Sequence, residues 1–273
     1  MSIFQGPIFI LDKATITLDT ALSNAAATGF PLSNMDDRVH PMRPYRTSSN
    51  PTTTTTTIVF DTGASAPRVN AIFLDNTNVG GWHVSYCGTT GGSYTSWGVG
   101  YTGALDALTG RGRVFMDLSD LATNNLRYIK LTAPPQTLLT TPAAIASIGG
   151  ITVGITGSVM NLPSNGVASL DIQSTGPTVI VDFDGGAREA TSIGARFVEI
   201  TFPVEPYIRE SQEAAVLAIM NKDVTPFVIF ENADLDVPTV HRAYLVRHGT
   251  TKNKLLYTAG RVFTFSMNLI EVV

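Results

Sequence analysis

The sequence predicts a mainly β protein: a jelly-roll β-sandwich and a second β-rich domain that carries one α-helix. Short apolar runs of strand length recur along the 273 residues, and many alternate with polar residues. Gly and Pro are plentiful while charged residues are few, a mixture that favours short strands joined by turns. Only one stretch has the pattern of an amphipathic helix.

Residues 1–29 are expected to form an N-terminal strand and an arm. The strand lies at residues 8–10, and a stretch of small residues follows at 21–28. Two interpretations of that stretch stay open. It is either an extended arm that lies across a neighbouring subunit, or an edge strand with a loop.

Residues 30–157 are expected to form the jelly roll. Four prolines make residues 30–51 irregular. In residues 82–87, Trp82 and Val84 share one face, so His83 is expected on the opposite, exposed face. Residues 88–110 are expected to be a long surface loop with at most one strand. The strands are predicted at 52–61, 69–75, 82–87, 113–118, 127–132 and 145–155.

Residues 158–273 are expected to form the second domain, a β-rich assembly domain, with its boundary in the Asn-, Ser- and Gly-containing stretch at 158–169. A helix at about 207–221 is predicted from Pro206 and the acidic residues around its start. Asp184 and Gly185 are predicted as the tip of a hairpin, because the flanking residues lack the spacing of a calcium loop. The strands are predicted at 179–184, 195–202, 227–231, 243–248 and 263–272.

The composition favours a protein that works through its surfaces. Charged residues make up 15% of the chain, against ~25% in typical soluble domains. Such a chain usually hides much of its surface in subunit contacts, so homo-oligomeric assembly is expected. The net charge of −4 argues against a nucleic-acid partner. No apolar run is long enough for a membrane span, and the N-terminus lacks the features of a secretion signal.

No catalytic constellation is visible, so we expect no enzyme activity, no cofactor and no metal. The four histidines are scattered and none has a metal-binding spacing such as HExxH. Cys87 is the single cysteine, which excludes an intramolecular disulfide, and we expect a structural thiol. Neither a nucleophile elbow nor a phosphate-binding loop is present.

One polar group stands out among the prolines of residues 38–46. It is either a docking or ligand-binding loop, or an ordered loop that wraps the sandwich with its arginines paired to Asp36 and Asp61. Both interpretations stay open. The residues are Arg38, His40, Arg43, Tyr45 and Arg46.

The order of four short segments resembles the galactose-binding-like, discoidin-type jelly roll. The segments are FPLSNM at 30–35, RPYRT at 43–47, IVFDTG at 58–63 and IFLDNTN at 72–78. Residues 127–131 resemble the late strand of that family, and 148–151 resemble its closing strand. The resemblance covers about residues 30–157 and implies a jelly-roll sandwich.

The arrangement as a whole is similar to tail-tip and minor tail proteins of tailed bacteriophages, including distal tail proteins. In those proteins a jelly roll can be accompanied by a β-rich assembly region, which residues 196–202, the helix to Met220, 226–230 and 263–273 fit. The resemblance implies a virion structural protein, assembled in the host cytoplasm, that forms or connects tail-tip components. Its implied partners are further copies of itself, in a ring, and other phage tail proteins.

The alternative is a carbohydrate-binding module that contacts a host-surface glycan. Sugar-binding jelly rolls place polar and aromatic residues on loops at one end of the sandwich, and Tyr94, Trp97 and Tyr101 are the candidates here. Their Gly-rich neighbours suit a protein contact surface equally well, and fold resemblance alone does not decide between the two.

Overall fold

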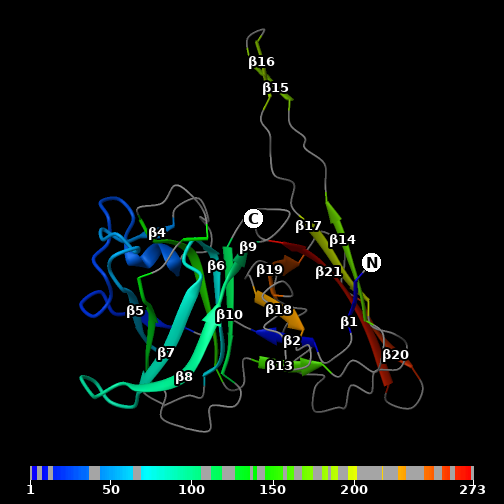
Figure 1. The fold of residues 1–273 in the computed structure, drawn as a ribbon. Coiled ribbons are helices and arrows are strands. Elements are labelled where there is room, and N and C mark those ends of the chain that lie inside the picture. The colour runs from blue at the N-terminus through cyan, green and yellow to red at the C-terminus, as the bar shows by residue number, and fades with distance from the viewer. Residues whose placement is uncertain are drawn as a thin grey trace.

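A computed structural model gives the fold (Figure 1). Among the described residues the named elements are antiparallel strands and a short 3₁₀ helix, η1 (Leu32–Met35), so the chain is mainly β, as predicted. The structure describes residues 2–4, 8–11, 15–36, 44–63, 69–105, 112–118, 127–135, 138–139, 145–155, 159–162, 168–174, 180–183, 186–189, 196–201, 217, 227–231, 243–248, 254–258 and 262–271.

Two five-stranded sheets form a β-sandwich, and the chain passes repeatedly from one to the other. The first sheet, in spatial order, contains β4 (Tyr45–Arg46), β12 (Ser147–Ile155), β6 (Val69–Thr77), β10 (Gly112–Asp117) and β9 (Ala104–Leu105). The second contains β3 (Thr17–Leu18), β5 (Thr56–Asp61), β11 (Tyr128–Ala133), β7 (Gly81–Cys87) and β8 (Thr95–Thr102). Residues 88–110, where at most one strand was expected, thus contain β8 and β9.

The core of the sandwich is built from alternate residues of its strands. In β11, Ile129 and Leu131 are buried while Lys130 between them is partly exposed, which is the period of a half-buried strand. Trp82 of β7 is fully buried, and its indole N–H donates to the Val79 carbonyl at 3.0 Å. His83 is exposed on the opposite face, as predicted.

Residues 19–30 run along the sandwich and bond to its strands. The backbone N–H of Asn24 donates to the Thr57 carbonyl of β5 at 3.0 Å, and that of Ala27 donates to the Arg46 carbonyl of β4 at 2.8 Å. The side chain of Ser23 accepts a hydrogen bond from the Val59 N–H at 2.9 Å. The structure therefore supports the loop interpretation of this stretch, not the arm.

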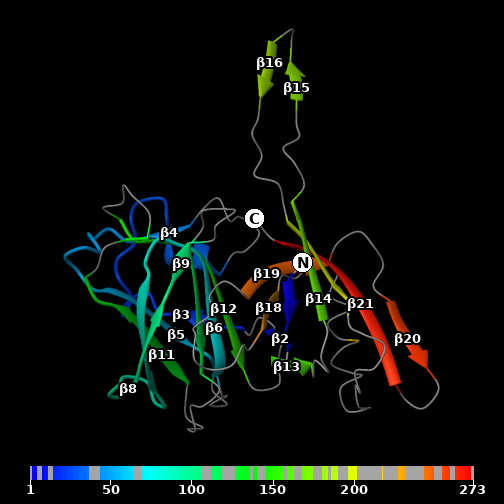
Figure 2. The ribbon, with the colours of Figure 1, turned by 45° about the vertical axis from the view of Figure 1, so that its right-hand side comes forward.

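A third sheet, of nine described strands, lies beside the sandwich (Figures 1 and 2). The first two strands of the chain belong to it, so the start and the end of the sequence share one sheet. Its path, in spatial order, is β1 (Ser2–Phe4), β14 (Ala168–Ser174), β17 (Arg196–Thr201), β21 (Val262–Glu271), β19 (Ala243–His248), β18 (Phe227–Glu231), β2 (Ile8–Leu11) and β13 (Val159–Leu162), with β20 (Lys254–Thr258) paired to β21.

The strands predicted for residues 158–273 are found. Those at 227–231 and 243–248 match the observed bounds of β18 and β19. The stretch at 158–169, expected to hold a domain boundary, contributes β13, which pairs with β2, and the start of β14, which pairs with β1. Of the helix predicted at 207–221, the structure describes Leu217, which is helical; the rest lies outside the described residues.

The predicted hairpin is confirmed. β15 (Ile180–Phe183) pairs with β16 (Gly186–Glu189) so that Phe183 lies opposite Gly186, while the predicted tip, Asp184 and Gly185, lies outside the described residues. In both views the hairpin stands away from the other sheets (Figures 1 and 2). Among the described strands, β15 and β16 pair only with each other.

Strand β6 is buried on both faces. Ile72 and Leu74 point into the sandwich core, and Phe73 and Asp75, which alternate with them, are also buried. Arg113 of β10, opposite Asp75, lies 5.8 Å from the ring centroid of Tyr244 in β19. Since β19 belongs to the nine-stranded sheet, this contact joins that sheet to the outer face of the sandwich.

Candidate functional site

The polar group at residues 38–46 is only partly described, and its two described members are structural. Arg38, His40 and Arg43 lie outside the described residues. Tyr45 is fully buried, and its hydroxyl donates to the Asn24 carbonyl at 2.8 Å. Burial raises the pKa of Tyr45 to about 12. Tyr45 therefore belongs to the core and presents no surface to a ligand.

Arg46 is half-buried and packs against its own chain. Its guanidinium carbon lies 4.2 Å from the centroid of the Phe30 ring, a cation–π geometry. Its backbone N–H donates to the Phe30 carbonyl at 3.3 Å. For Arg46, as for Tyr45, the structure supports the loop that wraps the sandwich.

Arg46, the described arginine of this loop, packs on Phe30, and the described partner of Asp61 is a different arginine. Asp61 pairs instead with Arg127, whose Nη2 lies 2.9 Å from Oδ2 and whose Nε lies 3.0 Å from Oδ1. The hydrogen bond from Arg127 holds the pKa of the Asp61 carboxyl below its ordinary value. The two residues lie at neighbouring ends of β5 and β11 (Tyr128 pairs with Asp61), a register that the sequence did not reveal.

Trp97 and Tyr101, two of the three glycan-contact candidates, bond to each other. Both are half-buried and pack against the core. The indole N–H of Trp97 donates to the Tyr101 hydroxyl at 2.9 Å, and that hydroxyl donates to the Asp117 carbonyl at 2.6 Å. Because Asp117 ends β10, this chain of hydrogen bonds links β8 to the opposite sheet.

Tyr94, the third candidate, has a different neighbour. The Lys130 ammonium lies 5.4 Å from the centroid of its ring, and burial raises the pKa of the Tyr94 hydroxyl. The structure thus brings together two of the three aromatic residues and uses their polar atoms within the chain.

Cys87 is bonded within its own turn. Cys87 is buried, and its thiol donates to the Thr89 carbonyl at 3.2 Å. No three His, Cys, Asp or Glu side chains gather into a possible metal site within the described ranges. Nor do those ranges contain a helix long and apolar enough to span a membrane.

Sequence reasoning missed the buried ion pair between Asp75 and Arg113. The Arg113 Nε lies 3.2 Å from Asp75 Oδ1, and the side chains are 3% and 7% exposed. Desolvating both charges is costly, so such a pair persists where its geometry is well satisfied. Only the register of β6 against β10 brings the two residues together, and no local pattern could have indicated it.

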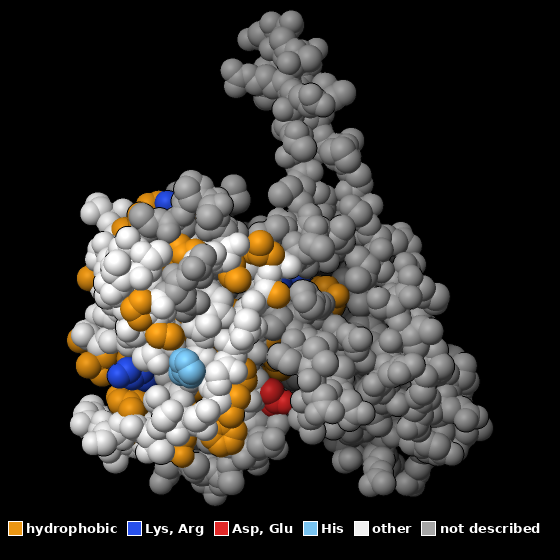
Figure 3. Space-filling view, viewed as in Figure 1, with side chains coloured by type: hydrophobic (Ala, Val, Ile, Leu, Met, Phe, Trp, Pro, Cys, Tyr) orange, Lys and Arg blue, Asp and Glu red, His pale blue; other side chains and the backbone are white. Residues whose placement is uncertain are grey.

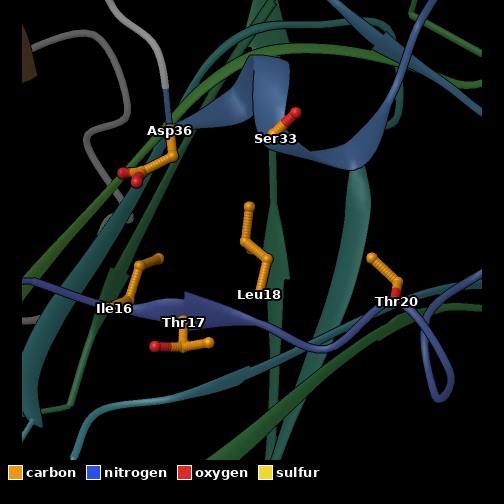
Figure 4. Close-up of a pocket in the computed structure, with 6 residues that line it drawn as sticks. All are labelled: Ile16, Thr17, Leu18, Thr20, Ser33 and Asp36. Carbon is orange, nitrogen blue, oxygen red and sulfur yellow. The ribbon is translucent and has the colours of Figure 1, made fainter.

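A pocket of about 390 Å³ opens between β3 and η1 (Figure 4). β3 is an edge strand of one sheet, whereas η1 packs against β4 and β12 of the other. The pocket therefore lies where the sandwich is open along one edge. Its lining residues are Ile16, Thr17, Leu18, Thr20, Ser33 and Asp36.

Comparisons with known proteins give no family. No family model matches the sequence, and neither does any curated protein. A structure of reduced XRCC1 bound to the catalytic domain of DNA polymerase β aligns with a TM-score of 0.37 and 9% identity, over 54% of this chain and 97% of that chain. Structures of a Ruminococcus gnavus GH29 fucosidase and a mutant of it, both with fucose, align with a TM-score of 0.32 and 17% identity. They cover 52% of this chain but 25% of the fucosidase. Similarities this weak support no conclusion about function.

Proposed function

We propose that the chain is a virion structural subunit of a tailed bacteriophage, which forms or connects components of the tail tip by homo-oligomeric assembly. The projecting hairpin β15–β16 is the observation that carries the assembly part of this proposal. The tail-tip part rests on the sequence resemblance.

A hairpin that stands alone needs a surface to pack on. An isolated pair of short strands is at best marginally stable in water, because it buries little apolar area. The hairpin has four residues in each strand and no third strand among those described. Contact with another subunit would supply the missing layer, and further copies of the chain are the occupant that we propose.

The surface of the sandwich fits the same function. On the described part of the face in Figure 3, hydrophobic side chains are scattered among backbone and other uncharged side chains, and charged side chains are few. Surfaces depleted of charge are typical of the centres of protein interfaces. The polar atoms of Trp97 and Tyr101 are bonded within the chain, which weakens the glycan alternative.

Replacing the hairpin tests the assembly. Residues 180–189 are exchanged for a short Gly-Ser linker, and native masses are compared by sedimentation at equal concentration. The unmodified chain is expected to form an oligomer, and the linker variant to be mainly monomeric. Leu22→Ser is the matched control: Leu22 is 52% exposed on the sandwich, and this variant should keep the oligomer. An unchanged oligomer in the linker variant would reject the hairpin as the contact.

Labelling of phage particles tests the location. An antibody against the chain should bind purified tailed particles at the tip of the tail. Label on the head, or particles that lack the chain altogether, would contradict the tail-tip assignment while leaving the assembly test unaffected.

A further inference from the structure

The outer face of the second sheet of the sandwich carries a polar strip across β11, β7 and β8. Along β7 and β11 the residues of this strip alternate with buried residues of the core, so their side chains point away from it. The cross-strand registers align the strip in two rows, in which Lys130 and His83 are the basic members. The first row is Lys130, Ser85 and Ser96, and the second is Thr132, His83 and Gly100.

Lys130 and His83 are neighbours on this face. Because Lys130 pairs with Ser85 and His83 pairs with Thr132, the two basic residues are diagonal neighbours, a relation that separates Cα atoms by ~7–8 Å. Gly100 lies opposite His83, and a Cβ there would be 3.3 Å from the imidazole Cε1, so the glycine leaves that side of the ring open. Figure 3 shows a histidine over β7 and β8 with a basic side chain close to it.

Both basic side chains keep donors for a ligand. In the described part of the chain, neither Lys130 nor His83 forms an ion pair. The Lys130 ammonium lies 5.4 Å from the centroid of the Tyr94 ring, and a ring face takes at most one of its three N–H donors. The imidazole of His83 carries an N–H in either protonation state. The nearby carboxylate of Asp19 accepts two backbone N–H groups of its own turn, which holds it there.

We propose that this strip binds the phosphate group of a sugar phosphate. A phosphate monoester carries about −1.5 to −2 charges and three strong acceptor oxygens. The Lys130 ammonium and the His83 N–H donate to these oxygens, and the phosphate lies between them. The hydroxyls of Ser85 and Thr132 can donate and accept, so they exchange hydrogen bonds with the sugar hydroxyls. The site goes beyond the proposed structural function, and it does not use the Trp97–Tyr101 pair.

A titration of the full chain with labelled His and Lys side chains tests the site directly. Glucose 6-phosphate is expected to shift the NMR signals of the His83 imidazole and the Lys130 side chain. Glucose at the same concentration should leave both signals in place, because it lacks the charge. Equal shifts with the two compounds, or no shift with glucose 6-phosphate, would overturn the proposal. This comparison needs no variant of the protein.

Substitutions of basic residues locate the charge. Lys130→Gln is expected to weaken binding of glucose 6-phosphate about 5-fold, the upper range for a solvent-accessible ion pair. His83→Ala should weaken it about 3-fold, through the loss of one hydrogen bond. Arg247→Gln is the matched control, because Arg247 is an exposed basic residue of β19 in a different sheet. Equal losses in Lys130→Gln and Arg247→Gln would mean a general effect of charge and would contradict the site.

Inorganic phosphate distinguishes the source of the phosphate group. If it binds at least ~3-fold more weakly than glucose 6-phosphate, the hydroxyl groups of the strip contact the sugar, as proposed. If it binds as tightly or more tightly, the strip takes free phosphate, and the sugar phosphate is rejected.

Discussion

At the scale of single residues, burial rather than polarity decides which side chains can act at the surface. Tyr45 was grouped with four basic neighbours as a contact loop, yet it is fully buried and bonded to Asn24. In a strand, neighbouring residues point to opposite faces, so a polar sequence neighbour says little about burial. Tyr45 and Arg46 illustrate this, since one is in the core and the other is half-exposed.

Tyr45→Phe tests the buried hydrogen bond. The variant leaves the Asn24 carbonyl without its donor, and the free energy of unfolding should fall by about 1–2 kcal/mol in urea denaturation. A loss within the error of the measurement would show that water replaces the hydroxyl.

The same residue predicts a response to alkaline pH. In the unfolded chain the Tyr45 hydroxyl ionises near pH ~10, whereas in the folded chain its pKa is about 12. The contribution of neutral Tyr45 is thus fully present below pH ~10 and is lost as the pH rises toward the folded pKa. Between those values the wild type should lose stability more steeply than Tyr45→Phe. Parallel pH profiles would contradict the assigned cause.

At the scale of elements, the close approach of β10 to β6 prevents the replacement of a glycine by a larger residue. A Cβ at Gly112 of β10 would collide with the carbonyl oxygen of Thr77 in β6, whereas at Gly150 of β12 the nearest atom would be the Met35 oxygen at 3.9 Å. Gly112→Ala should therefore lower stability by about 3 kcal/mol or more. Gly150→Ala, the matched control in the same sheet, should change it by less than ~1 kcal/mol. Similar thermal midpoints for both variants would refute this packing.

The local sequence pattern was sufficient to predict where most strands lie. It was not sufficient to predict which strands pair with each other. Apolar, β-branched segments such as 227–231 were predicted at their observed bounds. β13 and β14 were missed because their residues alternate weakly beside Pro, Asn and Gly, and their stability comes from pairing with β2 and β1. The Asp75–Arg113 pair was missed for the same reason, since register across the sheet creates it. The pocket combines β3 and η1, which no sequence period connects.

At the scale of the whole molecule, a buried arginine on the sandwich contacts the nine-stranded sheet. Arg113 pairs with Asp75 and faces Tyr244 of β19. Arg113→Ala would leave the Asp75 carboxylate buried without this partner, and we expect a loss of about 3–5 kcal/mol in the free energy of unfolding. The double variant Arg113→Met with Asp75→Leu removes both charges and should recover most of that loss. A double variant as unstable as the single one would contradict the ion-pair account.

Under the proposed function, the projecting hairpin and the low charge of the chain are features of a molecule that neighbouring subunits complete. A ring is the simplest closed arrangement of identical subunits with one repeated contact. In that arrangement the hairpin of each subunit would pack on the next.

The native mass of the purified chain over a concentration series tests the central claim most directly. Light scattering should give a closed oligomer, such as a trimer or hexamer, whose mass stops rising as the concentration increases. A monomer at every concentration would contradict homo-oligomeric assembly.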